Sequence, residues 1–206
     1  MKKIILVFSL ILVLTGCSVV RIDTSDIDNI LSVILTKDNK LYNQVGQGYK
    51  YYLPGGVNYI DSDDLNDILY CDGTYYYLYV DVISYYYQTK IDYNKNGTPY
   101  YFKLISPKDG FKSFGYLEIN KENDLYHLEF VYNHAKIEAI VHKNKLNDTV
   151  LNASYILSTI KYNHDIVEIM LQDNYFTNKT GKYNDYNSKE DNGKFIIEKE
   201  NTIEEG

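Results

Sequence analysis

Two neighbouring segments near the middle of the chain carry side chains of the types that bind metal ions. Alternating apolar residues predict strands over 125–132 and 135–142, joined by a two-residue turn. This register sets each large residue against a small or branched partner, such as Phe130 against Ile137. The same register places Glu129 opposite Glu138. That face also carries His127, Lys136 and His142.

Glu129 and Glu138 would repel each other across the ladder unless something neutralises them. A cation bound by these glutamates and the two histidines would neutralise the charge. Alternatively, this face is solvated and Lys136 nearby offsets the charge. No His-x-His or His-x₃-His spacing supports ligation. We therefore predict no metal and no cofactor.

Residues 92–97 match the first half of a calcium-binding loop. Asp92, Asn94 and Asn96 alternate before Gly97, as carboxylate and amide ligands do. The twelfth position should be a bidentate glutamate and is Lys103. The flanking residues read as strands, 90–93 and 99–105, so we interpret this stretch as a hairpin turn.

The sequence lacks the spacings typical of catalytic sites. It contains no Gly-x-Ser-x-Gly, no phosphate loop and no paired-cysteine knuckle. After Cys17, the single thiol is Cys71, for which the sequence places no base. We predict that the protein is not an enzyme. A hydrolase with an unrecognised site is the least favoured alternative.

Residues 70–87 read YCDGTYYYLYVDVISYYY and are dense in tyrosine. Asp72-Gly73 predicts a hairpin turn. On the strand that follows, Tyr75, Tyr77 and Tyr79 share one face, while the other face is more apolar. Tyr85 and Tyr87 would be in phase if the strand continued. The tyrosine face is either covered by its own chain or open to a glycan or peptide, and its first three tyrosines are the candidate ligand-binding residues.

Helical periodicity appears in the chain before and after the predicted strands. An apolar stripe predicts a helix from Ile27 to about Lys37, capped by Thr24, Ser25 or Asp26. A second stripe predicts a helix over 148–160 capped by Asn147 or Asp148, and a shorter helix over 165–171. Tyr49–Leu53 reads as a strand and 61–69 as a short helical turn.

These elements predict an α+β fold, with an antiparallel β-sheet of about six to eight strands and with an N-terminal and a C-terminal helix packed on one face. Over roughly 114–161 the order of strands, closing hairpin and helix resembles the Mog1/PsbP-like sandwich. No functional motif accompanies that resemblance.

The first residues read MKKIILVFSLILVLTGC. Lys2 and Lys3 precede an apolar run that is too short for a transmembrane helix of about 20 residues. Leu14-Thr15-Gly16-Cys17 resembles the lipobox of bacterial lipoproteins. The resemblance implies cleavage before Cys17 and a diacylglyceryl group on its thiol, with acyl chains such as palmitate. Two acyl chains make a stable anchor.

We therefore divide the chain into a signal peptide over 1–16, a lipidated tether over 17–24, a single α+β domain over 25–173, and a polar, loose tail over 174–206. The domain is expected at the outer face of the cytoplasmic membrane. Ser18 would permit sorting to the outer membrane in a cell that has one.

The mature chain is acidic. Removal of residues 1–16 leaves 19 basic and 28 acidic residues, a net charge of −9. This charge disfavours nucleic acid as a partner. We predict a non-catalytic protein-interaction or envelope-assembly module with an envelope protein as partner. The alternative is a glycan- or peptide-binding module that uses the tyrosine face.

Overall fold

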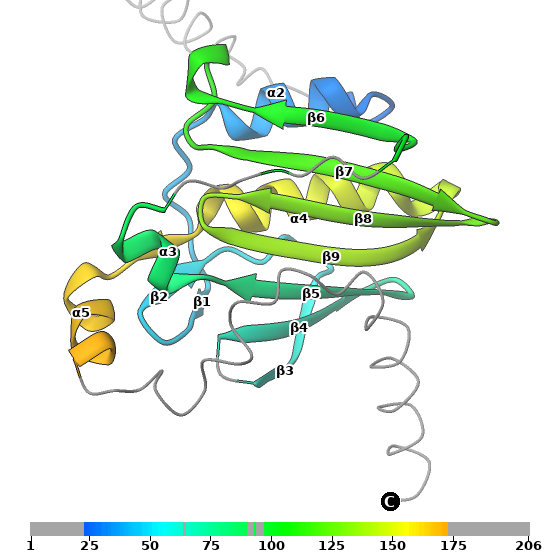
Figure 1. Cartoon of the computed structure of the whole chain (residues 1–206). Helices are drawn as coiled ribbons and strands as arrows, with labels where there is room; N and C mark the ends of the chain where they lie inside the picture. Colours follow the sequence, from blue (N-terminus) through cyan, green and yellow to red (C-terminus); the bar gives the residue numbers. More distant parts are fainter. Residues whose placement is uncertain (1–22, 64, 90–92, 94–96, 173–206) are drawn as a thin grey trace, which may run out of the picture.

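The computed structural model describes residues 23–63, 65–89, 93 and 97–172. Seven strands form an antiparallel sheet with the strand order β3-β4-β5-β9-β8-β7-β6 (Figure 1). The strands are β3 (Asn58–Asp63), β4 (Asn66–Cys71), β5 (Thr74–Val80), β6 (Tyr101–Ile105), β7 (Gly115–Glu122), β8 (Leu125–Tyr132) and β9 (Ala135–His142). The predicted α+β class is confirmed.

Two tight turns fix the register of this sheet. Asn133 and His134, between β8 and β9, have φ of 53° and 57°, as a type I′ hairpin requires. Asp72-Gly73 joins β4 to β5 in the same way, with φ of 46° and 84°. The predicted pairing of Phe130 with Ile137 is confirmed.

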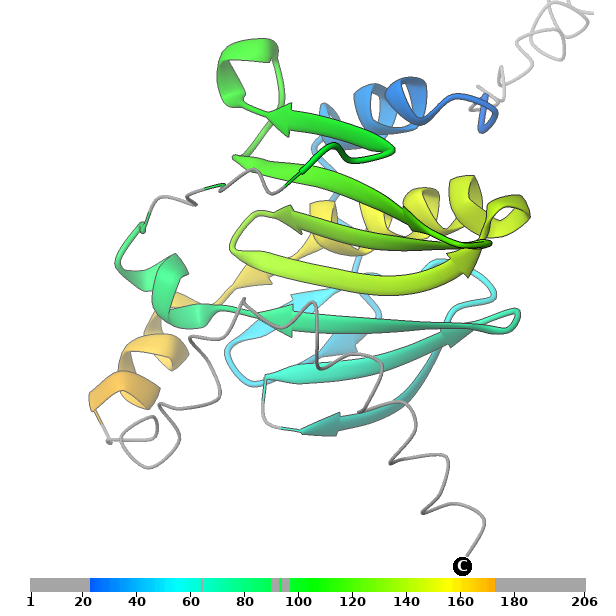
Figure 2. The ribbon, with the colours of Figure 1, turned by 45° about the vertical axis from the view of Figure 1, so that its right-hand side comes forward.

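Helices α2 (Ile27–Leu35) and α4 (Leu146–Thr159) lie on one face of the sheet, here called the helix side (Figures 1 and 2). The side chain of Asp26 accepts from the backbone N–H of Asp28 and caps α2. The predicted cap of α4 is wrong, because Lys145 is its N-cap and a 3₁₀ turn, Lys143–Lys145, leads directly into it. Asn147 instead donates to the carbonyl oxygens of Thr24 and Ser25.

A second, three-stranded sheet covers the helix side near β4. It has the order β1-β2-β10, with strands β1 (Gln44–Val45), β2 (Tyr49–Tyr51) and β10 (Lys161–Tyr162). The hydroxyls of Tyr49 and Tyr51 reach Asp67 on β4. Helix α5 (His164–Gln172) follows β10 and confirms the predicted short helix.

The tyrosine-rich strand β5 ends earlier than the alternation of residues in the sequence would permit. β5 ends at Val80, and Asp81 caps the short helix α3 (Val82–Tyr86), accepting from the backbone N–H and the hydroxyl of Ser84 at 2.8 and 2.6 Å. Tyr85 and Tyr87 are therefore not in phase with Tyr75. A capping side chain outweighs β-propensity here.

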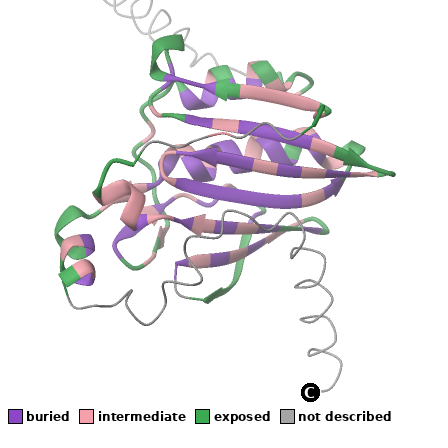
Figure 3. Ribbon diagram, viewed as in Figure 1, coloured by how far each residue is buried: buried purple, intermediate pink, exposed green. Residues whose placement is uncertain are grey.

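The predicted helical turn over 61–69 is also wrong. These residues span parts of β3 and β4, which pair with each other across Asp63 and Asn66. β3 is exposed along its whole length, so its polar residues carry no alternating signal (Figure 3). Sheet pairing, a tertiary interaction, decided this segment.

The core lies between the helix side of the sheet and α2, α4 and the small sheet. Tyr76, Leu78 and Val80 of β5 are buried there, as predicted. Among the described helices, none is long and apolar enough to cross a membrane. The tail 174–206, the turn 94–96 and most of the predicted arm 90–93 lie outside the described residues.

Candidate functional site

Tyr75, Tyr77 and Tyr79 lie on the face of the sheet opposite the helices. Tyr75 is 41% exposed and packs against the ring of Tyr70, with centroids 5.0 Å apart. Tyr77 and Tyr79 are half-buried. The Nζ of Lys136 lies 4.9 Å from the ring centroid of Tyr79. The row is thus partly covered, and ligand binding by these tyrosines stays a prediction.

Three glutamates face one another on this side of the sheet. Glu118, Glu129 and Glu138 are directly opposite in adjacent strands β7, β8 and β9. Glu118 is fully buried and Glu138 is almost so. The predicted juxtaposition of Glu129 with Glu138 is therefore real.

Each glutamate has its own local partner. The hydroxyl of Tyr93 donates to Glu118, and the amide of Asn120 donates to the same side chain at 2.6 Å. The Tyr116 hydroxyl donates to Glu129 at 2.7 Å. Lys136 forms a buried 2.7 Å ion pair with Glu138. Burial, followed by the charge of Glu129, raises the pKa of Tyr116, so it remains a proton donor.

The histidines do not join these glutamates. His127 Nε2 lies 3.3 Å from Glu122, and His142 is exposed at the end of β9, opposite Leu125. Within the described part of the chain, no group of three His, Cys, Asp or Glu side chains could hold a metal ion. The calcium-like residues Asp92, Asn94 and Asn96 lie outside that part.

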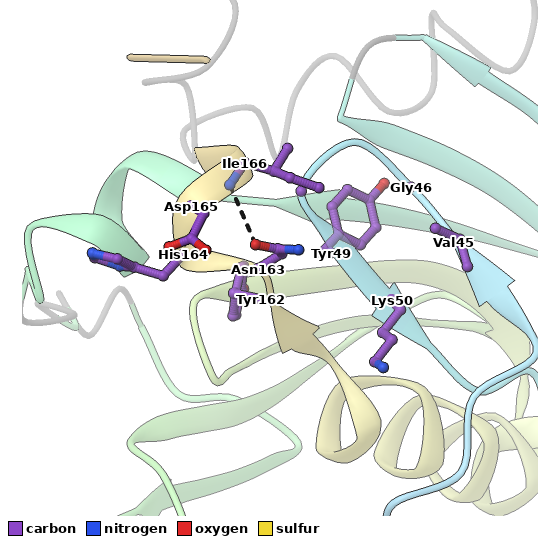
Figure 4. A pocket seen from close by; sticks show the side chains of 10 residues that line it. Val45, Gly46, Tyr49, Lys50, Tyr162, Asn163, His164, Asp165 and Ile166 are labelled. Carbon is purple, nitrogen blue, oxygen red and sulfur yellow. Dashed lines mark hydrogen bonds between the residues drawn. The ribbon is translucent and has the colours of Figure 1, made fainter. Parts of the chain in front are cut away.

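A cavity of about 380 Å³ opens between the small sheet and α5 (Figure 4). Its lining combines aromatic, apolar and charged side chains with two glycines. The lining residues are Val45, Gly46, Gly48, Tyr49, Lys50, Tyr162, Asn163, His164, Asp165 and Ile166. This volume is near the lower end of the range for ligand pockets, roughly 300–1,000 Å³.

Close packing fixes the first wall of the cavity. A Cβ on Gly46 would lie 2.3 Å from the ring of Tyr49, so that ring lies directly on the glycine backbone. Gly48 has φ of 80°, and a Cβ there would lie 3.0 Å from Val167 of α5. Only glycine fits at these positions.

Ring stacking fixes the second wall. Tyr162 stacks on Tyr85 of α3 with centroids 4.0 Å apart, and its hydroxyl donates to the carbonyl oxygens of Asn133 and His134 at 2.8 Å. His164 stacks on Tyr86 at 5.1 Å. The walls are therefore held rigid by α3 and by the β8–β9 turn.

A buried carboxylate lies beneath the cavity. Asp67 is 5% exposed, and its Oδ2 accepts from Tyr51 at 2.7 Å and from Tyr49 at 3.2 Å. Burial raises the pKa of Asp67, and the two hydroxyl donors offset part of that rise. The ring of Tyr49 thus links the cavity wall to a titratable group in the core.

Exposed apolar side chains lie in the lining of this cavity and next to it. Val45 is 76% exposed, and Ile166 and Ile169 lie three residues apart on α5, on one side of the helix. Tyr42 is also exposed, and Lys50 of the lining lies 4.0 Å from its ring centroid. We call Tyr42, Val45, Ile166 and Ile169 the apolar rim.

The sequence offered almost no signal for this cavity. Its two sides come from residues far apart in the chain, which the hydrogen bond from the Asn163 N–H to the Gly48 oxygen brings together. The closely spaced Gly46 and Gly48 are the one local hint of a tightly packed turn.

Cys71 lies next to the β4–β5 turn and is a half-buried free thiol. Burial, followed by the charge of Asp72, raises the pKa of this thiol, so the reactive thiolate is disfavoured. Cys17 lies outside the described residues.

Comparison with known proteins gives one match, at the N-terminus. Residues 1–18 match the family model for the prokaryotic membrane lipoprotein lipid attachment site. No curated protein and no solved structure matches the chain, so the resemblance to the Mog1/PsbP-like sandwich stays a prediction. The attachment site confirms the lipobox, and the chain is a bacterial lipoprotein.

Proposed function

We propose that this lipoprotein is a non-catalytic protein-interaction module at the outer face of the cytoplasmic membrane. Its binding surface is the cavity between the small sheet and α5, together with the apolar rim. The observation that carries the proposal is the gathering of exposed apolar side chains around a rigid, partly apolar cavity. Such patches on otherwise polar surfaces mark interaction sites.

The position of the cavity suits a partner within the envelope. The start of α2 at Ile27 lies ten positions after Cys17, so the tether reaches at most about 35 Å. α2 and α5 lie toward opposite ends of the molecule (Figure 1). With α2 held near the membrane, the cavity beside α5 is directed away from it.

The chemistry of the cavity suits a polypeptide. Lys50 and Asp165 offer opposite charges beside the aromatic ring of Tyr49. Protein interfaces combine an apolar centre with a polar margin in this way. A cavity of this size accepts an anchoring side chain of the partner, and such anchors carry most of the binding energy.

The test is photo-crosslinking from defined positions on the whole lipoprotein in the cells that make it. A photoreactive residue at Val45 or Ile166 is expected to crosslink to the same envelope protein. The same residue at Lys121, exposed near the end of β7, is the control. A second substitution, Ile169→Asp, should abolish the crosslink from Val45.

Crosslinking from Val45 that equals crosslinking from Lys121, or that survives Ile169→Asp, contradicts this proposal. Thermal unfolding of the Ile169→Asp variant should match that of the natural protein, because Ile169 is exposed.

A glycan- or peptide-binding role for the tyrosine face is the second candidate. The observation in its favour is the exposed ring of Tyr75, which packs against half-buried Tyr70 on the helix-free face. Chemical labelling of tyrosines, read by mass spectrometry, tests it. Labelling of Tyr75 that is lost on addition of cell-wall glycan or peptide supports this role, and unchanged labelling rejects it.

A further inference from the structure

The two edges of the large sheet differ in how they are protected. Within the described residues, no strand pairs with the outer edge of β3 or of β6. The register of β3 shifts between Tyr59 and Asp61, and this strand carries exposed carboxylates. Bulges and charges of this kind prevent edge-to-edge pairing. β6 has no bulge and no carboxylate, since its pairing with β7 is unbroken from Tyr101 to Ile105. Its one charged side chain, Lys103, is paired with Asp28 of α2.

We infer that two copies of this lipoprotein associate through the outer edges of their β6 strands, which pair antiparallel about Lys103 to form one continuous sheet. A two-fold axis through this position places Phe102 opposite Leu104 of the second copy. Tyr101 then lies opposite Ile105 of the second copy. The same patch therefore serves both copies, as a two-fold interface requires.

The pairing would bring the apolar side chains of β6 into contact with those of the second copy. Leu104 is 60% exposed and lies on the face opposite the helices. Phe102 lies on the same face, under the ring of Tyr93 at a centroid distance of 4.4 Å. Aromatic and apolar side chains that face each other across strands stabilise a ladder.

The charge at the centre of the pairing is already balanced. Lys103 would lie opposite Lys103 of the second copy, and like charges in that position are unfavourable. In each copy, however, Lys103 forms an ion pair with Asp28 of α2. The Tyr101 hydroxyl donates to the same carboxylate at 3.0 Å. Each copy thus brings its own counter-charge to the two-fold axis.

The lipid anchor fits this arrangement. An axis perpendicular to the sheet keeps the helix sides of both copies on the same face of the continuous sheet. α2 lies beside β6 (Figure 1) and contacts it through Asp28. In the proposed pairing both α2 helices therefore begin close to the axis. Two tethers of about 35 Å at most then reach one membrane. Confinement to that membrane raises the effective concentration and offsets the small area of a single strand pair.

The experiment is cysteine crosslinking of the whole lipoprotein in membranes of the cells that make it. The background is Cys71→Ser, which removes the one described thiol. In this background, Lys103→Cys is expected to form a disulfide-linked species of twice the chain mass on mild oxidation. The matched control, Asp61→Cys on the other edge, is expected to form no disulfide-linked dimer.

Two further variants test the register and the fold. Tagged chains carrying Phe102→Cys and Leu104→Cys should crosslink to each other, whereas Leu104→Cys alone should not. Adding Leu104→Asp to Lys103→Cys should abolish the crosslink while thermal unfolding stays unchanged, because Leu104 is exposed. Crosslinking at Lys103→Cys that is no stronger than at Asp61→Cys, or that yields a product with a different protein, overturns the inference.

Discussion

Asp67 shows how a single buried side chain can make stability depend on pH. Its pKa is raised in the folded protein by burial, so the native state binds a proton more readily than the unfolded chain does. A group of this kind contributes stability that is fully present below its unfolded pKa and is lost as the pH rises through its folded pKa. Each unit of raised pKa corresponds to about 1.4 kcal/mol.

We therefore predict that Asp67→Asn changes the pH profile of unfolding. Relative to the natural protein, the variant should gain stability as the pH rises from the acid range to neutrality, because it carries no charge to bury. Denaturant unfolding at a series of pH values measures this. Asp124→Asn, at an exposed turn, should not show this relative gain. A stability difference between the Asp67 variant and the natural protein that is constant with pH would refute the prediction.

The glutamates that face one another in β7, β8 and β9 could be predicted only in part from the sequence. Glu129 and Glu138 could be placed opposite each other from the alternation of residues 125–142 alone. The sequence analysis predicted no metal and kept Lys136 as the nearby charge, and Lys136 does pair with Glu138. The partner of Glu129 could not be predicted in this way, because Tyr116 comes from β7 and reaches Glu129 across the sheet.

At the scale of the element, Gly115 at the start of β7 marks a close approach of two strands. A Cβ at this position would lie 2.0 Å from the carbonyl oxygen of Val131 on β8. We predict that Gly115→Ala destabilises the protein by about 3 kcal/mol, at the upper end of overpacking costs. Chemical denaturation measures the change. Gly55→Ala is the matched control, because no atom lies within 4 Å of its added Cβ.

The cap of α3 is the second element-level test. Asp81→Ala removes the acceptor of the Ser84 backbone N–H and hydroxyl, and should cost about 1 kcal/mol, as for other N-caps. Asp81→Asn retains a capping oxygen and should lose less. Thermal unfolding separates the two variants, and equal losses would mean that the cap is not the cause.

At the scale of the whole molecule, the anchor and the domain are separable. Lipid attachment is expected at Cys17, so Cys17→Ser should abolish metabolic labelling with a palmitate analogue. Cys71→Ser should leave the label unchanged, because Cys71 lies in the folded domain beside the β4–β5 turn. Label that persists in the Cys17 variant would place the acyl chains elsewhere.

Local patterns were sufficient for several elements. The stripe of Ile30, Leu31 and Ile34 predicted α2, and all three residues are buried. The alternation of β8 and β9, with their two-residue turn, gave the correct register. These features depend on residues close in the chain, where helical or strand periodicity is directly visible.

The failures have a common physical cause. The end of β3 was mistaken for a helical turn because its exposed residues 61–63 are polar, and only pairing with β4 makes them part of a strand. α4 begins without a side-chain cap because the preceding 3₁₀ turn supplies its start. The cavity was missed because it depends on contacts between Gly48 and residues more than a hundred positions later.

By itself, the sequence determined that this chain is a lipid-anchored, acidic protein with an α+β domain. The lipobox, the net charge and the local periodicities depend on composition or on residues close together, and they need no folded neighbour. Only the tertiary structure decided which of the described strands lie at the edges of the sheet, which groups contact the glutamates and where a cavity forms. Each of these depends on side chains that long-range strand pairing brings together, and single-sequence periodicity carries no information about such pairing.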